Sequence, residues 1–258
     1  MITQKNQGPS VGLFVTCMVD LMRPSVGFAA LRLLERAGAH VVVPANQTCC
    51  GQPAYNSGDF ADARAIAQDV IAAFQDYDHV VAPSGSCAGM IRVHYPDLFK
   101  DDADWLARAE DLAGRTFELS QYLADHLDWS QPSADFPHTV AYHDSCASRR
   151  ELGVVDQPRA LLATLPGVEL QEIADNETCC GFGGLFSVKF PDVSGAITDA
   201  KVQMIEDTGA EVLVGADLGC LTNMAGKLKR RGSKVRVFHL AEVLAGMTDG
   251  AAIGEGEA

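Results

Sequence analysis

The sequence carries one cysteine pattern twice, and this repetition restricts the fold more than any other feature. The first set runs C-x31-CCG-x35-C and the second runs C-x32-CCG-x38-C. The cysteines are Cys17, Cys49, Cys50 and Cys87 in the first set, and Cys146, Cys179, Cys180 and Cys220 in the second. Solenoid units usually span about 20 to 50 residues, whereas these sets recur after roughly 120 residues, so the pattern indicates two duplicated domains.

The apolar segments that precede the cysteines repeat as well. VGLFVTC corresponds to TVAYHDSC, and DHVVAPSGSC corresponds to AEVLVGADLGC. The segment between the repeats is rich in Pro, Ser and Asp, and the end of the chain lacks apolar periodicity. We therefore expect a first repeat at 9–127, a linker at 128–138, a second repeat at 139–247 and a disordered tail at 248–258.

Strands alternate with helices in each repeat. Pro24 is expected to open a helix that has Phe28, Leu31 and Leu34 on its inward face. The β-α-β-α-β order predicts an α/β fold in which each repeat forms a small parallel sheet flanked by helices. This is a Rossmann-like, three-layer arrangement.

A later helix of each repeat shows apolar spacing at i, i+3, i+4 and i+7. In the first repeat, Asp59 is expected to cap a helix whose inward face includes Ala63, Ala67 and Val70. In the second repeat, the same criterion selects Val193, Ile197, Ala200 and Met204 as the inward face.

The acidic composition excludes some classes of partner. The chain has 34 acidic and 20 basic residues and a net charge of −14, which disfavours nucleic acid and anionic membranes. No apolar run approaches the roughly 18 residues that span a bilayer. We expect a cytoplasmic protein, where thiols stay reduced and eight cysteines indicate metal or redox chemistry rather than disulfides.

The cysteines follow the carboxyl ends of predicted strands, where open α/β sheets bind ligands. Buried small side chains are one interpretation of them. A vicinal disulfide is a second, but adjacent Cα atoms lie about 3.8 Å apart and unstrained disulfides want about 4.4–6.8 Å. Zinc is a third, although the chain has no C-x-x-C pair. An iron–sulfur cluster fits better, because adjacent thiolates can reach neighbouring irons and the following glycine lets backbone N–H groups approach the sulfurs.

The double pattern resembles the CCG-domain proteins, a cysteine-rich, heterodisulfide reductase B-like class. CCGQPAYNSG, PSGSCAGM and CCGFGGLFSVK are most similar to the lactate utilization protein A family, and the resemblance covers nearly the whole chain. It implies two iron–sulfur clusters of the [4Fe–4S] type, with the eight cysteines as their metal and cofactor ligands.

The chain departs from the full CCG pattern, which ends each repeat in C-x-x-C. Ser84 and Asp217 occupy the first of those cysteine positions, so a cluster with five thiolates is in doubt while four per repeat remain. His143, three residues before Cys146, could ligate metal, hydrogen-bond a sulfur or move a proton. A structural histidine at a strand end is the interpretation that the sequence favours.

The resemblance implies an electron-transfer subunit in the oxidation of L-lactate to pyruvate. Its expected partners are lactate utilization proteins B and C, with hydride abstraction carried out elsewhere in the complex. A heterodisulfide or thiol–disulfide reductase subunit is one alternative, and a zinc-stabilised scaffold without a redox role is another. The sequence assigns no catalytic acid or base.

Overall fold

Two similar α/β units make up the chain. The computed structural model describes residues 8–127, 129 and 135–256, and the chain divides into two compact units at 1–129 and 130–258. Most of the predicted linker, namely residues 128 and 130–134, lies outside the described residues. Across the described ranges, no helix is both long and apolar enough to cross a bilayer.

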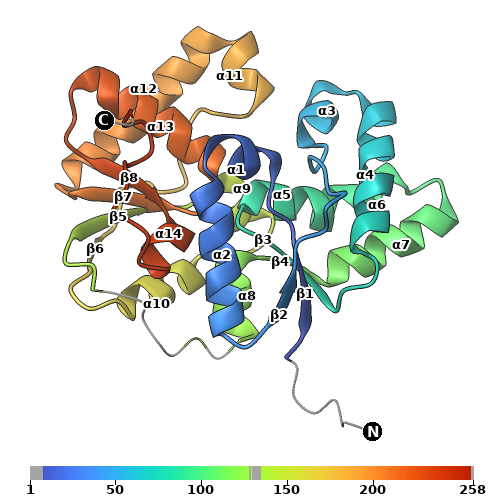
Figure 1. The fold of residues 1–258 in the computed structure, drawn as a ribbon. Coiled ribbons are helices and arrows are strands. Elements are labelled where there is room, and N and C mark those ends of the chain that lie inside the picture. The colour runs from blue at the N-terminus through green and yellow to red at the C-terminus, as the bar shows by residue number, and fades with distance from the viewer. Residues whose placement is uncertain (1–7, 128, 130–134, 257–258) are drawn as a thin grey trace, which may run out of the picture. The chain divides into compact units, whose positions relative to one another are not determined.

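The first unit is built on a four-stranded parallel sheet in the order β2-β1-β3-β4. Its strands are β1 (Ser10–Leu13), β2 (His40–Val42), β3 (His79–Ala82) and β4 (Thr116–Glu118). Its helices are α1 (Cys17–Met22), α2 (Pro24–Arg36), α3 (Gln52–Ser57), α4 (Phe60–Phe74), α5 (Gly85–Gly89), the π-helix η1 (Met90–His94), α6 (Tyr95–Leu98), α7 (Ala103–Gly114) and α8 (Leu119–Asp125). In Figure 1, α2 lies on one side of this sheet, and α4, α6 and α7 lie on the other.

The second unit repeats this plan with the strand order β6-β5-β7-β8, again all parallel. Its strands are β5 (Thr139–His143), β6 (Glu169–Gln171), β7 (Val212–Gly215) and β8 (Arg236–His239). Its helices are α9 (Cys146–Arg150), α10 (Asp156–Ala163), α11 (Leu185–Lys189), α12 (Pro191–Asp207), α13 (Leu218–Arg231) and α14 (Leu240–Leu244). The predicted fold class of two parallel sheets flanked by helices is therefore confirmed.

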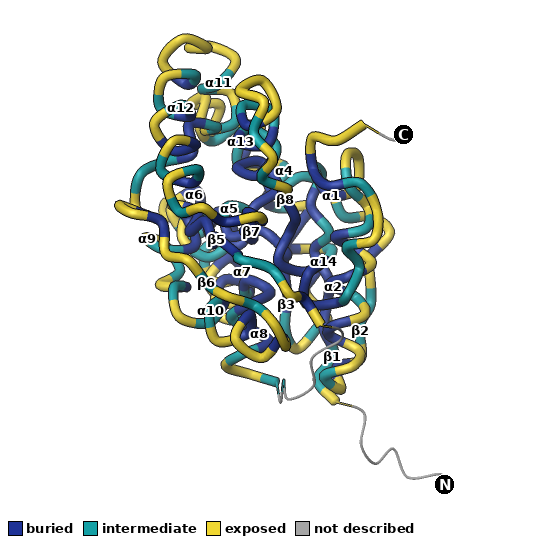
Figure 2. The backbone as a smooth tube through the Cα atoms, turned by 90° about the vertical axis from the view of Figure 1, so that its left-hand side faces the viewer, coloured by how far each residue is buried: buried dark blue, intermediate teal, exposed yellow. Residues whose placement is uncertain are grey.

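The middle strands of each sheet carry the core. β1 and β3 are buried at all but their first residue, and β7 is buried throughout, as the dark blue segments in Figure 2 show. Continuous burial is expected for parallel strands covered on both faces. Because all strands of a sheet run the same way, their carboxyl ends, where the cysteines follow, meet at one edge.

The predicted inward face of α12 is wrong, and that of α2 is correct only in part. Leu34 of α2 is buried as predicted, but Phe28 is 65% exposed and the helix also buries Val26, Ala29 and Leu33. In α12, Val193 is exposed, and Ser194, Thr198 and Lys201 are buried. Hydrophobic periodicity located the wrong stripe of α12 because three of its five buried positions are polar.

The predicted disordered tail is also wrong for its described part, which ends at residue 256. Ala252 and Ile253 are buried, and the Ile253 N–H donates to the Val237 carbonyl of β8 at 2.8 Å. Lys229 of α13 donates to the Gly254 carbonyl at 2.9 Å. Two apolar residues and main-chain hydrogen bonds are enough to hold a segment that shows no helical or strand period.

Candidate metal centres

The four cysteines of the first repeat come together at the carboxyl edge of its sheet. Cys17 begins α1, Cys49 and Cys50 lie between β2 and α3, and Cys87 lies in α5 after β3. The Cys17 and Cys49 sulfurs are 3.7 Å apart. The thiol of Cys50 is within hydrogen-bonding reach of those of Cys49 and Cys87.

The second repeat gathers its cysteines in the same order. Cys146 begins α9 and contacts Cys179, while Cys180 contacts both Cys179 and Cys220 of α13. All eight cysteines are free thiols. The structure thus brings together the four predicted ligands of each repeat, and their role as metal ligands stays a prediction.

Each CCG segment turns its backbone toward the sulfurs. Gly51 and Gly181 have φ of 82° and 83°, in the left-handed region that glycine adopts without strain. Their N–H groups donate to Cys49 Sγ at 3.4 Å and to Cys179 Sγ at 3.3 Å. N–H donation stabilises sulfur as a thiolate, which is the form that binds metals.

The central thiols are poised to ionise first. Hydrogen bonds from the Cys17 and Cys146 thiols, with further donation from the glycine N–H groups, lower the pKa of Cys49 and of Cys179 to about 2. The same contacts raise the pKa of the donors Cys17 and Cys146. Each repeat therefore presents one strongly acidic thiol at the middle of its group.

The two positions that depart from the CCG pattern begin helices. Ser84 is the N-cap of α5, and its hydroxyl accepts from the Cys87 N–H at 3.4 Å. Asp217 is the N-cap residue of α13, three positions before Cys220, and it is buried. Ser84 thus orients a thiol by capping the helix that carries it.

A surface pocket opens beside the first group of thiols. Its volume is about 370 Å³, and Cys17 and Cys49 form part of its wall with Thr16, Asp20 and Gln47. Gln47 accepts from the Val15 N–H at 2.8 Å and donates to the Leu13 carbonyl at 3.2 Å, which ties the CCG approach to the end of β1. Small molecules or a partner surface can therefore reach these two sulfurs.

His143 joins the second group of thiols. It ends β5 and is 2% exposed, and one of its ring nitrogens lies within 4.8 Å of the Cys180 and Cys220 sulfurs. Burial lowers the pKa of His143 to about 3. The sequence favoured a structural role for this residue, yet neither ring nitrogen has a hydrogen-bond partner.

Sequence reasoning missed the polar residues that hold the second CCG segment. Thr198 and Asn223 both donate to the Cys180 carbonyl, at 3.1 and 3.0 Å, and Ser194 donates to the Gly181 carbonyl at 2.8 Å. In the first repeat, the Tyr95 hydroxyl does this for the Cys50 carbonyl at 2.9 Å. The available signal was the repeat itself. An alignment of α12 with α4 puts Ser194 and Thr198 at positions where α4 has inward-facing residues.

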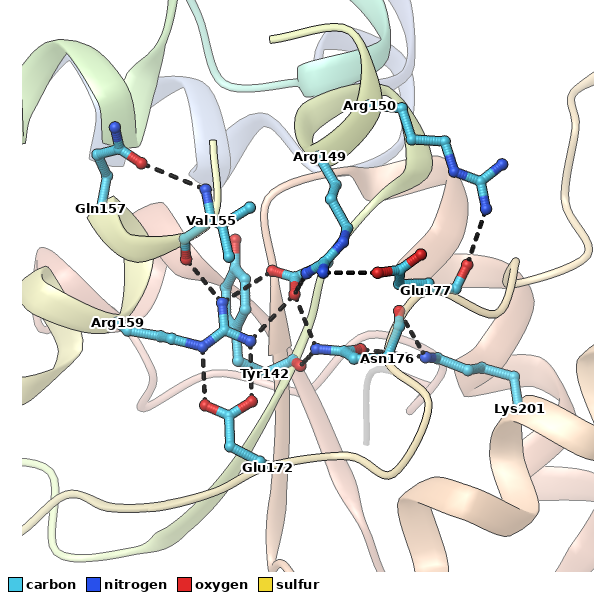
Figure 3. Close-up of polar contacts among 11 residues, drawn as sticks. Tyr142, Arg149, Arg150, Val155, Gln157, Arg159, Glu172, Asn176, Glu177 and Lys201 are labelled. Atoms are coloured by element: carbon cyan, nitrogen blue, oxygen red, sulfur yellow. Dashed lines mark hydrogen bonds and ion pairs between the residues drawn. The ribbon is translucent and has the colours of Figure 1, made fainter. Parts of the chain in front are cut away.

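A second missed network surrounds Asp144, directly after His143. Its carboxylate accepts from Arg159 at 3.0 Å and from Asn176 at 2.9 Å, and Figure 3 labels both of these donors. Asn176 in turn accepts twice from Lys201, through its main-chain and side-chain oxygens, both at 3.1 Å. The network fixes the DNETCC approach to Cys179 between β5 and α12.

The family of the chain follows from its similarity to known proteins. The Cysteine-rich domain family model, named CCG, matches residues 11–92 and 140–225. Lactate utilization protein A of Exiguobacterium sp. is 48% identical over 238 residues, covering 92% of this chain and 97% of that protein. The chain belongs to the lactate utilization protein A family. The member from Bacillus subtilis is 47% identical over 234 residues, 91% of this chain and 98% of its own length.

A solved structure supports the fold of this lactate utilization protein A family chain. The crystal structure of a hypothetical protein from Helicobacter pylori superposes with a TM-score of 0.66 at 12% identity over 98% of this chain. The chain spans about half (52%) of that protein's length. At this identity the likeness concerns the fold alone.

The donor chemistry of both sites fits a thiolate-bound metal or cluster. Four free thiols converge in each repeat, a glycine N–H donates to the central sulfur, and the second site adds a buried imidazole without a partner. Soft thiolate donors select zinc, copper(I) or iron–sulfur clusters. The clustered cysteines of this family member therefore indicate metal or cluster binding.

Proposed function

We propose that the chain is an iron–sulfur electron-transfer protein of lactate oxidation. Each repeat would hold one cluster of the [4Fe–4S] type, the first through Cys17, Cys49, Cys50 and Cys87 and the second through Cys146, Cys179, Cys180 and Cys220. The observation that carries the proposal is the convergence of four free thiols, with the same order of contacts, in both repeats of a lactate utilization protein A family member.

When bound, an iron–sulfur cluster accepts and releases electrons one at a time. The protein controls how much water and which dipoles surround the sulfurs. The buried Cys50 and Cys180 keep water from one side of each thiol group, while the half-exposed Cys17 and Cys49 face a surface pocket. The Gly51 and Gly181 N–H groups add positive dipoles at the sulfurs, which favours a more negative, reduced centre.

The proposed physiological reaction is oxidation of L-lactate to pyruvate, which releases two electrons and two protons. Hydride abstraction would take place on another subunit, and this chain would receive the electrons. The proposed partners are lactate utilization proteins B and C, and the proposed compartment is the cytoplasm. The names of the relatives support a place in lactate utilization.

The test is iron and acid-labile sulfide analysis with EPR on anaerobically purified protein. We expect the Cys50→Ser and Cys180→Ser variants each to lose about half of the bound iron. Thr164→Ala is the control, since the Thr164 hydroxyl donates to the Leu161 carbonyl at the end of α10 rather than to a residue of either thiol group, and the variant should keep the iron. A colourless protein with stoichiometric zinc, or variants that retain all iron, would contradict the proposal.

A second measurement separates the redox alternatives. The purified complex with its partner proteins should be reduced by L-lactate under anaerobic conditions, as followed by the visible absorption of the clusters. Oxidation by a disulfide substrate, with no response to lactate, would instead identify a heterodisulfide reductase-like subunit.

A further inference from the structure

The two repeats differ in one side chain at the carboxyl end of the first strand of each sheet, where Phe14 directly follows β1 and His143 is the last residue of β5. Phe14 and His143 both lie three residues before the first cysteine of their repeat, Cys17 or Cys146. Phe14 is fully buried and packs against Phe74, with ring centroids 5.5 Å apart. The fold thus places an apolar ring at this position in one repeat and an imidazole in the other.

The imidazole of His143 lacks the partners that a buried polar group requires. Its side chain is 2% exposed, and neither Nδ1 nor Nε2 is hydrogen-bonded. Buried polar atoms in folded proteins are nearly always paired, because an unpaired one has lost its water without a replacement hydrogen bond. A ring nitrogen faces the Cys180 and Cys220 sulfurs, all within 4.8 Å of one another. That spacing suits donors that share one metal.

The neighbouring polar groups are already committed to the protein. The Lys201 ammonium donates to both oxygens of Asn176, and Asn176 donates to Asp144 and to the Tyr142 carbonyl. Thr198 is held by Asn223 and the Cys180 carbonyl. These contacts use the polar groups of α12 on the protein itself and leave the imidazole directed at the thiols.

The helices α4 and α12 also differ at equivalent buried positions. The first three buried positions of α4 are Ala63, Ala67 and Val70, and those of α12 are Ser194, Thr198 and Lys201. At these positions the first repeat carries apolar side chains, whereas the second carries two hydroxyl groups and a lysine.

We propose that His143 is a nitrogen ligand of the metal centre in the second repeat, whereas the centre of the first repeat has sulfur ligands only. The inference rests on the proposed cluster binding and adds a residue to it. The bond that forms is between iron and the lone pair of a neutral ring nitrogen, so the ligand gains or loses no electron. Because the imidazole is added to the four thiolates and replaces none of them, it leaves the charge of the centre unchanged, and its directly bonded nitrogen is what identifies it.

The decisive experiment looks for a directly bonded nitrogen by pulsed EPR and ENDOR on the reduced, iron-loaded chain. The Cys50→Ser variant isolates the second centre. We expect a strong nitrogen coupling that changes when histidine is labelled with ¹⁵N. His143→Phe, which installs the residue of the first repeat, should lose this coupling. His138→Phe is the control, because this half-exposed residue of the same unit pairs with Glu211 at 3.2 Å.

The outcomes separate this inference from the proposed function. Iron bound at the second site without nitrogen coupling, with only the weak coupling of a hydrogen-bonded nitrogen, or with coupling that survives His143→Phe overturns the inference and leaves the proposed function standing. A chain that binds no iron overturns both. If His143→Phe does not fold, the isotope substitution in protein that keeps His143 still decides.

Discussion

Gly51 and Gly181 occupy the same place in the two repeats, yet their surroundings differ. Both have positive φ and donate an N–H to a cysteine sulfur. A Cβ at Gly51 would lie 3.3 Å from the Ile66 side chain, which is an adjustable neighbour. A Cβ at Gly181 would overlap the Thr198 hydroxyl and lie 2.7 Å from the Ser194 carbonyl. The second CCG segment is therefore the more tightly enclosed one.

Alanine at each glycine should show this difference in the free energy of unfolding. We expect Gly51→Ala to cost about 1–2 kcal/mol, chiefly from the left-handed backbone. Gly181→Ala should cost at least about 1 kcal/mol more, since it also overpacks α12. Chemical denaturation of both variants measures this, with Gly58→Ala as a reference for positive φ without crowding. Equal losses at Gly51 and Gly181 would contradict the structure.

Glu172 illustrates how a single carboxylate links stability to pH. Its hydrogen bonds from Arg159, at 2.7 and 2.9 Å, lower the pKa of the carboxyl below its usual value of 4.5. A lowered pKa means that the stabilisation is present above pH 4.5 and is lost as the pH falls through the folded value.

The Glu172→Gln variant should therefore be less stable than the unmodified chain at pH 7, by less than about 1 kcal/mol because the Glu172 side chain is 56% exposed. The difference should shrink as the pH is lowered below 4.5. Thermal unfolding of both proteins at several pH values measures it. A difference that grows on acidification would exclude this role for the pair.

At the scale of elements, Arg159 connects α10 to the loop after β5. It donates to both oxygens of Asp144, whose side chain is 1% exposed, at 3.0 Å each. The remaining donors to this carboxylate give one hydrogen bond each, and the only other cation among them, Arg149, lies at 3.4 Å, whereas the neutral Asn176 lies at 2.9 Å. Most of the charge compensation of a buried carboxylate thus comes from one residue of α10.

Replacing Arg159 by methionine should destabilise the second unit by about 3 kcal/mol, since it leaves a buried carboxylate short of positive charge. The double variant with Asp144→Asn should recover part of that loss. Denaturation of the single and double variants tests the coupling. If the two losses simply add, Arg159 does not act through Asp144.

The elements also show how far the sequence could predict the structure. The parallel direction of the strands and the placement of eight cysteines at strand ends follow from the alternation of strands and helices, because parallel strands end at one edge. The strand order β2-β1-β3-β4 does not follow from it. The inward face of α4 followed from Ala63 and Val70, which are buried. That of α12 did not, since Thr198 and Lys201 are buried through hydrogen bonds, which hydrophobic periodicity cannot register.

The site was predictable only in part for the same reason. Each cysteine is marked by its chemistry and spacing, so the convergence of four thiols could be foreseen. The role of His143, by contrast, depends on whether the polar groups of the surrounding elements are free to hydrogen-bond its imidazole. Nothing in YHDSC reveals that Lys201 and Asn176 are occupied with each other.

At the scale of the whole molecule, each unit has its own sheet and core. Leu33 of α2 and Leu221 of α13 are both fully buried, one in each unit. Units with separate cores commonly unfold in separate steps. The chain then has two free energies of unfolding, one for each unit.

We expect Leu33→Ala and Leu221→Ala to shift different calorimetric transitions to lower temperature. Each should lower the free energy of unfolding of its own unit by about 3 kcal/mol, the typical loss for a buried leucine. Each variant serves as the control for the other. A single transition that both variants shift equally would show that the units unfold together.

The segment that follows α14 has a consequence for self-association. β8 is the last strand of its sheet, with β7 on one side only. The pairing of Ile253 with Val237 occupies part of the open side of β8. An exposed strand edge is a template on which another chain can add a strand and begin aggregation. Residues 252 and 253 thus cover part of the open edge of the second sheet. A chain shortened before them would expose this edge of β8 to strand addition by other copies of the chain.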